Sequence, residues 1–323
     1  MTNRGQPPLP KPYVFVPITP LERRDRQHPR GHERYHPGTL AGTINGKLLV
    51  QTPLHVWSGE ITMTGRRDTP LVKSHLRANG RPAVPGSTFK GVVRSIAEAF
   101  THSCVRVTRA RPNQLPQGAV ACRSREQLCL ACRIFGAMDF QGHVRFSDAV
   151  LAKGTELVIV GMPSLFAPRN RERVYYKDND QVVGRKFYQH GKPVQGNTPV
   201  EACPVGAALE FGLHFENLSP AELGVLLIAL GQGDGVQSPR LWPKLGAGKP
   251  VCYGTVAVAI AELRVEEAGA AMYASYDPPA PQPATTWSTY LQAARELVIP
   301  ERLQSLAQIL QWPSNRDCPD RNY

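Results

Sequence analysis

Four closely spaced cysteines constrain the fold of this chain more than any other feature. Cys129 and Cys132 form a CxxC pair, and Cys104 and Cys122 precede it, so the four lie within 29 residues in the spacing C-x17-C-x6-C-x2-C. A CxxC turn directs two thiolates at one ion, and two more thiolates complete a tetrahedral shell. Four sulfur ligands favour Zn²⁺ and leave no open coordination position, so the spacing predicts a structural zinc site.

Other interpretations of these cysteines stay open at this stage. His102 could replace Cys104 as the fourth ligand, the CxxC could be a redox pair, or the thiols could be free and buried. The segment between the ligands is too polar and too rich in Pro and Gly to form a core, so metal binding would hold a zinc insertion at 101–135. The remaining cysteines are isolated in the sequence: Cys203, Cys252 and Cys318. The odd total of seven cysteines argues against a disulfide framework.

The charge of the chain indicates a polyanionic partner. Lys and Arg number 38 against 26 Asp and Glu, which gives a formal charge of +12. The basic residues cluster at 21–34, 66–81, 106–111 and 169–192. Such clusters suit nucleic acid. None of them has the pattern of a basic amphipathic helix at a membrane surface.

The sequence contains no feature typical of membrane insertion or export. No apolar run approaches the roughly 18 residues that a transmembrane helix needs. The first residues, MTNRGQPPLPKP, lack the apolar region of a signal peptide. We therefore expect a cytoplasmic protein with no membrane partner.

Hydrophobic periodicity predicts an α+β fold. Strand patterns occur at 43–52, 142–151, 207–215 and 255–263, and helical patterns at 89–100 and 220–230. A polar loop is expected at 58–70 and a helix pair at 286–310. The order β, α, β, β, α, β matches the split βαβ plan of ferredoxin-like folds. RNA-recognition sheets share this plan, so nucleic acid is a reasonable partner.

The first predicted helix begins with the features of an anion site. Free backbone N–H groups and the positive end of the helix dipole attract anions at segment 85–91, PGSTFKG. The side chains that would add donors to a phosphate are Ser87, Thr88, Lys90 and Arg94. The alternative is an ordinary helix start, capped by Ser87 or Thr88, with Lys90 on the surface.

Two further segments contain candidate RNA contacts. The glycines of 244–254 allow close backbone approach to a ligand, Lys244 and Lys249 supply charge, and Tyr253 offers a ring for base stacking. Segment 169–192 interleaves basic and aromatic residues, a pattern typical of single-stranded RNA binding. Its candidate contacts are Arg169, Arg171, Arg173, Arg185, Lys186, Phe187 and Tyr188. The alternative is a surface hairpin with solvated charges.

Together these motifs resemble the RAMP superfamily of CRISPR-associated proteins, and above all the repeating backbone subunit of type III-like RNA-guided effector complexes. The motifs follow the order found in that family: LVQTPLH at 49–55, DTPLV at 68–72, PGSTFKGVVR at 85–94, GHVRFSDAV at 142–150 and the glycine-rich 244–254. The resemblance spans about residues 40–265. The cysteine cluster and the GRKFY stretch are similar to type III-D branches or to the type VII backbone.

The resemblance implies an antiviral ribonucleoprotein whose RRM-like core, at 41–265, polymerises along a CRISPR guide RNA. Its partners would be copies of itself, complementary target RNA, other effector subunits and, in some lineages, a separate nuclease. A protruding thumb hairpin, at 163–200, would kink the guide–target duplex, while base pairing supplies specificity. Residues 1–40 would form a basic N-terminal arm, and 266–323 a linker and C-terminal helical segment.

The resemblance also singles out Asp68 as the catalytic candidate. In active members an aspartate in this loop supports metal-dependent cleavage of target RNA, and Asp68-Thr69-Pro70 fits that position. One carboxylate can hold Mg²⁺ or help to align the ribose 2′-OH. Mg²⁺ is therefore expected only if the protein cleaves its target. The alternative is an ion pair with Arg66 or Arg67.

Two enzymatic alternatives remain. A ribonuclease of the same superfamily that processes the guide precursor would need a general acid and base, for which His55, His75 and His143 are candidates. Their spacing pairs none of them. A zinc-dependent hydrolase would need histidine or carboxylate ligands and an open metal position, which the cysteine cluster does not provide.

Overall fold

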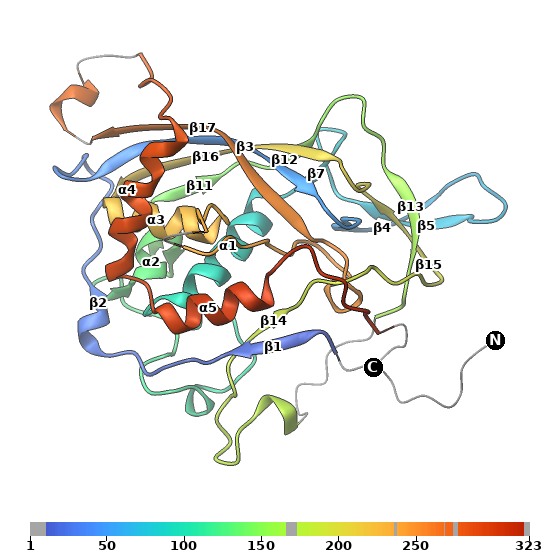
Figure 1. The fold of residues 1–323 in the computed structure, drawn as a ribbon, viewed down its shortest axis with the longest axis horizontal. Coiled ribbons are helices and arrows are strands. Elements are labelled where there is room, and N and C mark those ends of the chain that lie inside the picture. Colours follow the sequence, from blue (N-terminus) through green and yellow to red (C-terminus); the bar gives the residue numbers. More distant parts are fainter. Residues whose placement is uncertain (1–10, 166–172, 236–237, 268, 274–276, 320–323) are drawn as a thin grey trace.

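A seven-stranded sheet forms the centre of the computed structural model, which describes residues 11–165, 173–235, 238–267, 269–273 and 277–319 (Figure 1). Helices cover one face of this sheet, and a second sheet of four strands lies beside it. The fold is therefore α+β, as the sequence predicts. Within the described ranges, no helix has the length and apolar character that crossing a membrane requires.

The central strands have the connectivity of a ferredoxin-like fold. Their order in the sheet is β17 (Val256–Glu267), β3 (Leu40–Val50), β16 (Ala208–Leu218) and β12 (Ala149–Leu151). All neighbours are antiparallel. Helix α1 (Gly86–Phe100) connects β3 towards β12, and α3 (Pro220–Ala229) connects β16 to β17. The two βαβ units are β3–α1–β12 and β16–α3–β17. In the sheet, β16 lies between the two strands of the first unit and β3 between those of the second, which is the predicted split βαβ plan.

Aromatic and aliphatic side chains join the helices to the sheet. Phe89 on α1 contacts Phe211 of β16, with 5.1 Å between ring centroids, and Val93, Ile96 and Phe100 continue the buried face. Helix α3 is buried on all sides because α4 (Trp287–Ala293) covers its outer face. Together α1 and α3 form the layer between the sheet and the C-terminal helices (Figure 1).

Several local predictions about helices are confirmed. Helix α3 begins after Ser219, whose side chain accepts the Glu222 N–H while Glu222 bonds back to the Ser219 N–H. This reciprocal pair is a capping box, a typical start for a helix. The helix pair predicted at 286–310 is present as α4 and α5 (Pro300–Ile309).

The start of α1 differs from the prediction. The helix begins at Gly86 after Pro85, and neither Ser87 nor Thr88 caps it. The Asp148 carboxylate accepts the Gly86 N–H at 2.8 Å instead. This role of Asp148 also interrupts the predicted strand 142–151, which is split into β11 (Val144–Phe146) and β12.

The expectation of a polar loop at 58–70 is wrong for residues 58–63, which belong to a strand, and right for residues 64–70. Strands β4 (Trp57–Met63) and β5 (Leu71–His75) form a hairpin that projects from the body (Figure 1). It joins β15 (Thr198–Ala202) and β13 (Val158–Met162) in the four-stranded sheet. Most side chains of β4 are exposed on both faces, so the strand lacks the alternating polarity by which sequence analysis recognises one.

The described part of the N-terminal arm lies along the body. Strand β1 (Tyr13–Val16) pairs with β14 (Arg185–Tyr188), and β2 (Arg26–Gln27) pairs with β8 (Leu128–Cys129). Val16 and Leu21 are buried in the core. The other short elements are β6 (Arg77–Ala78), β7 (Arg81–Val84), α2 (Leu130–Phe135), β9 (Gly136–Ala137) and β10 (Phe140–Gln141).

Two of the cysteines outside the cluster are not isolated in space. Cys252 and Cys318 form a disulfide across 66 residues of sequence, which joins the C-terminal segment to the glycine-rich loop. The argument against disulfides from the odd total of cysteines is wrong for this pair, because spacing cannot report which distant cysteines meet. Cys203 is free and buried.

Candidate nucleic-acid interface and metal centre

The four clustered cysteines meet in the interior beside α2. Cys129 ends β8 and precedes the first turn of α2, Cys132 lies in that turn, and Cys104 follows α1. The Cys104 sulfur lies 3.6 Å from that of Cys132 and 3.5 Å from that of Cys129. A tetrahedral ion with bonds of about 2.3 Å would space its sulfur ligands about 3.8 Å apart. With Cys122, all four ligand atoms lie within 4.8 Å of one another, so the cluster fits a metal ion.

Hydrogen-bond donors surround the sulfurs. The Cys104 N–H donates to the Cys129 Sγ, and the Cys129 N–H donates to the Cys122 Sγ, each at 3.4 Å. Arg94 donates to the Cys132 Sγ at 3.1 Å. Such donors stabilise thiolates and orient them toward an ion. His102 is exposed and faces Asp25 at 4.0 Å, so the structure favours Cys104 over His102 as the fourth ligand.

A buried ion-pair network lies next to this cluster. Arg94 Nε bonds the Glu98 carboxylate at 2.7 Å, and Arg185 bonds its other oxygen at 2.5 Å. Arg94 also donates to the Gly136 carbonyl at 2.6 Å. Both guanidinium groups are thus bound within the protein, so RNA contact by Arg94 or Arg185 stays a prediction. Sequence analysis missed Glu98, although an Arg–Glu pair four residues apart on a helix signals such a contact.

The start of α1 offers less to a phosphate than the sequence suggested. Ser87 is exposed and Thr88 half-buried. Lys90 donates to the Val144 carbonyl at 2.8 Å, and burial, with the nearby charge of Arg94, lowers its pKa. Asp148 already supplies an anion at the helix N-terminus, so a phosphate would have to approach beside a carboxylate.

The candidate residues of the glycine-rich loop face inward. Lys244 is buried and donates to the Gln189 carbonyl at 2.8 Å, and Lys249 donates to the Gly246 carbonyl at 2.7 Å. Burial lowers the pKa of Lys244 to about 7 and that of Lys249 to about 8. Tyr253 is 2% exposed and donates to the Gly161 carbonyl. Its ring therefore presents no face on which a base could stack.

The basic and aromatic segment is partly described. Arg169 and Arg171 lie outside the described residues, and Arg173 begins a short 3-10 helix, Arg173–Tyr175. The Lys186 ammonium on β14 lies over the rings of Tyr13, Tyr188 and Tyr175, at 4.3, 4.8 and 5.1 Å from their centroids. Sequence analysis missed Tyr13, whose signal was the aromatic alternation YVFV at 13–16.

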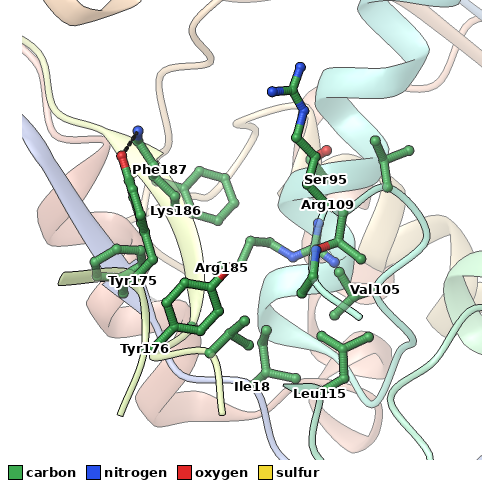
Figure 2. A pocket seen from close by; sticks show the side chains of 16 residues that line it. Ile18, Ser95, Val105, Arg109, Leu115, Tyr175, Tyr176, Arg185, Lys186 and Phe187 are labelled. Atoms are coloured by element: carbon green, nitrogen blue, oxygen red, sulfur yellow. Dashed lines mark hydrogen bonds between the residues drawn. The ribbon is translucent and has the colours of Figure 1, made fainter. Parts of the chain in front are cut away.

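A cavity of about 410 Å³ opens beside this aromatic group (Figure 2). It lies between β1 and β14 on one side and α1 and the cysteine-containing segment on the other. Its basic and aromatic lining includes Arg109, Tyr175, Tyr176, Arg185, Lys186 and Phe187. Cations next to ring faces are the combination that single-stranded nucleic acid uses. Three regions distant in sequence thus form one candidate interface.

Asp68 is exposed in the turn of the projecting β4–β5 hairpin, next to the exposed Arg66 and Arg67. Among the described residues, no ion pair joins Asp68 to either arginine, and no group of three metal-ligating side chains includes it. A single carboxylate can still hold Mg²⁺ when waters and substrate phosphates complete the octahedral shell. Cleavage of RNA at Asp68 therefore stays a prediction.

The three candidate histidines do not form one catalytic group. His55 and His75 are buried, with their ring centroids 6.1 Å apart. His55 contacts the Glu201 carbonyl, and the ring of His75 accepts a hydrogen bond from the Val56 N–H. Burial lowers the pKa of both, to about 4 for His75. His143 contacts His32 elsewhere in the molecule. The buried imidazoles of His55 and His75 therefore have structural hydrogen-bonding roles.

A comparison with family models supplies the classification of this fold. The model of the RAMP superfamily matches residues 47–257, which is more than half of the chain. The chain therefore belongs to the RAMP superfamily. Membership indicates a CRISPR-associated, RNA-binding protein that works with other effector subunits. Among curated proteins, no sequence matches the chain.

Proposed function

We propose that this protein is the guide-RNA-binding backbone subunit of a type III-like CRISPR effector complex, and that its copies polymerise along the guide. The observation that carries the proposal is the family match, which runs from the end of β3 to the start of β17 and so includes α1, β12, β16 and α3 of the ferredoxin-like core. The cysteine cluster and the GRKFY strand favour a type III-D or type VII-like complex. The guide RNA pairs with its target while the protein binds backbone and shape.

The arrangement of charged elements supports an RNA path on this subunit. The projecting hairpin presents two exposed arginines, and the cavity beside β14 presents cations among aromatic rings. Segment 163–200, whose described part includes β14, acts as the thumb in this proposal. The zinc insertion at 101–135 contains the cysteine cluster, and a Zn²⁺ ion held by Cys104, Cys122, Cys129 and Cys132 stabilises the insertion without a catalytic role.

Target cleavage at Asp68 is the catalytic part of the proposal. The guide-loaded complex is incubated with labelled complementary RNA and Mg²⁺, using the wild type, Asp68→Ala and Asp68→Asn. Cuts at regular intervals that both variants abolish make Asp68 the cleaving residue. The matched control is Asp139→Asn, an exposed aspartate in the turn between β9 and β10, which should cut like wild type.

Other results assign a different role. Tight target binding without cuts would leave the protein as a scaffold that presents RNA to a separate nuclease. Cleavage of a guide precursor in the absence of target would instead favour the processing ribonuclease. Failure to bind guide RNA at all would contradict the proposal.

A further inference from the structure

Three side chains that the proposed function does not use meet at one place in the fold. His32 comes from the N-terminal segment, His143 directly precedes β11, and Glu216 lies on β16. Their ligand atoms all lie within 4.8 Å of one another. His32 and Glu216 are 184 residues apart in sequence, so only the fold brings them together.

Two hydrogen-bond acceptors flank the His32 ring. Its Nε2 lies 2.7 Å from the Gln141 carbonyl oxygen, and its Nδ1 lies 2.7 Å from a Glu216 carboxylate oxygen. Both partners are acceptors, whereas a neutral imidazole has one N–H. A second proton on Nδ1 satisfies the pair at this distance, and a metal ion that displaced this proton would hold the two atoms slightly farther apart, at about 3.3 Å.

His143 provides an independent indication of a ligand. It is 3% exposed, and neither ring nitrogen has a hydrogen-bond partner within the described part of the chain. Buried imidazole nitrogens normally have a hydrogen-bond partner or bind a ligand, and the two nitrogens of this ring lack a hydrogen-bond partner among the residues that the structure describes. Its centroid lies 4.6 Å from that of His32.

The loop that carries His32 is held in place by the sheet. Asn217, in the left-handed conformation at φ 53°, donates to the Gly31 and Arg34 carbonyls at 3.2 and 3.0 Å. Its side-chain oxygen accepts the His36 N–H at 3.0 Å. The Glu216 N–H donates to the His143 carbonyl at 3.0 Å, so these two residues are fixed to each other as well. The three candidate ligands are therefore positioned by backbone contacts.

We propose that His32, His143 and Glu216 bind a divalent transition-metal ion, with Zn²⁺ the first candidate. Two imidazoles and one carboxylate are a known donor set for zinc and leave a fourth position for water or a ligand. The ion replaces the proton between His32 and Glu216, while Gln141 orients the His32 ring from behind. Arg145 bonds the same carboxylate at 2.8 Å and compensates its remaining charge. Binding fastens the N-terminal segment to the sheet.

Cobalt titration separates this site from the cysteine cluster. Co²⁺ bound to thiolates absorbs strongly through sulfur-to-metal charge transfer, whereas Co²⁺ bound to imidazole and carboxylate does not. The metal-free full chain should bind two equivalents, one with and one without the charge-transfer band. Cys129→Ser with Cys132→Ser should remove the first equivalent alone, and His32→Gln or His143→Gln the second alone.

A surface histidine supplies the control. His28 pairs with Glu126 at 2.7 Å on an exposed surface and belongs to no group of three metal ligands among the described residues. His28→Gln should bind both equivalents. Detection of a single equivalent in the wild type would overturn the second site. So would a His32→Gln variant that binds as many ions as His28→Gln, and this comparison holds even if His143→Gln fails to fold, because His32 is partly exposed.

Discussion

Glu98 is the residue whose loss should destabilise the fold most directly. It is buried and accepts from both Arg94 and Arg185. Glu98→Gln would remove the charge that compensates two guanidinium groups, and breaking such a buried pair typically costs about 3–5 kcal/mol. Urea unfolding monitored by circular dichroism measures the change in free energy of unfolding.

A surface ion pair provides the comparison for that variant. Glu210 lies 3.6 Å from Lys47, and both side chains are well exposed. Glu210→Gln should change the free energy of unfolding by less than about 0.5 kcal/mol, because surface pairs are screened by solvent. Equal effects of the two variants would show that the Glu98 network does not stabilise the protein.

The presence of Arg and Lys in the sequence did not show which of these side chains are available to contact RNA. Arg94, Arg185 and Lys244 all carry the charge that a phosphate contact needs, but the fold binds each of them to an internal acceptor. Apart from Glu98, which lies four residues after Arg94 on α1, those acceptors come from segments distant in sequence, so no local pattern could identify them. The cysteine cluster was predictable because the ligand type and the CxxC spacing carry most of the information.

The β4–β5 hairpin is the element most exposed to an RNA ligand. Arg66 and Arg67 lie at its tip, and Met63 on β4 is 84% exposed. Replacing both arginines by Gln should weaken guide binding and reduce the salt slope of log K by about 1.4, at about 0.7 per contact with a single strand. Fluorescence anisotropy at several salt concentrations measures the slope.

The control for the hairpin is a single exposed lysine elsewhere. Lys153 lies in the turn that follows β12, and Lys153→Gln should leave the slope unchanged. A slope that is unchanged in the double arginine variant would remove the hairpin from the RNA path. Loss of binding with an unchanged slope would point to misfolding, which circular dichroism would detect.

Elements with a single buried face were predictable from the sequence, whereas elements without one were not. Buried and exposed side chains alternate along β3 and β16 because one face of the sheet packs on α1 and α3. The start of α3 can be recognised from Ser219, which caps it. Strand β4 has no buried face, so its pattern resembled a loop. The pairing of β1 with β14 depends on segments far apart in sequence, which periodicity cannot report.

The disulfide between Cys252 and Cys318 links the glycine-rich loop to the C-terminal segment. It therefore closes a loop of 66 residues of sequence. Cross-linking residues 66 apart should stabilise the protein by up to about 4 kcal/mol through the entropy of the unfolded state. Cys318→Ser should lower the urea midpoint accordingly, measured with Zn²⁺ present. Reductant should lower the midpoint of the wild type and leave that of Cys318→Ser unchanged. Equal midpoints for the two oxidised proteins would contradict this role.

The free energy of unfolding should fall in acid because of three buried histidines: His75, His143 and His190. Burial lowers the pKa of His75 and His143 to about 4 and that of His190 to about 3. Well above pH 6.5 these rings are neutral in both the folded and the unfolded state. Between pH 6.5 and about 4 the unfolded chain takes up protons that the native state does not, so the free energy of unfolding falls, at up to about 1.4 kcal/mol per pH unit for each ring.

His190 allows this acid effect to be assigned. Its two ring nitrogens contact the Thr255 hydroxyl and the Trp242 carbonyl, at 2.8 and 2.9 Å, so the ring is structural and has no part in the proposed RNA interface. Urea unfolding at pH values from 7 to 4.5 should show a shallower loss of stability in His190→Gln than in the wild type, because one titrating ring is gone. The exposed His28→Gln should follow the wild type. Parallel curves for wild type and His190→Gln would mean that other groups, such as the cysteine cluster losing its metal, control the acid response.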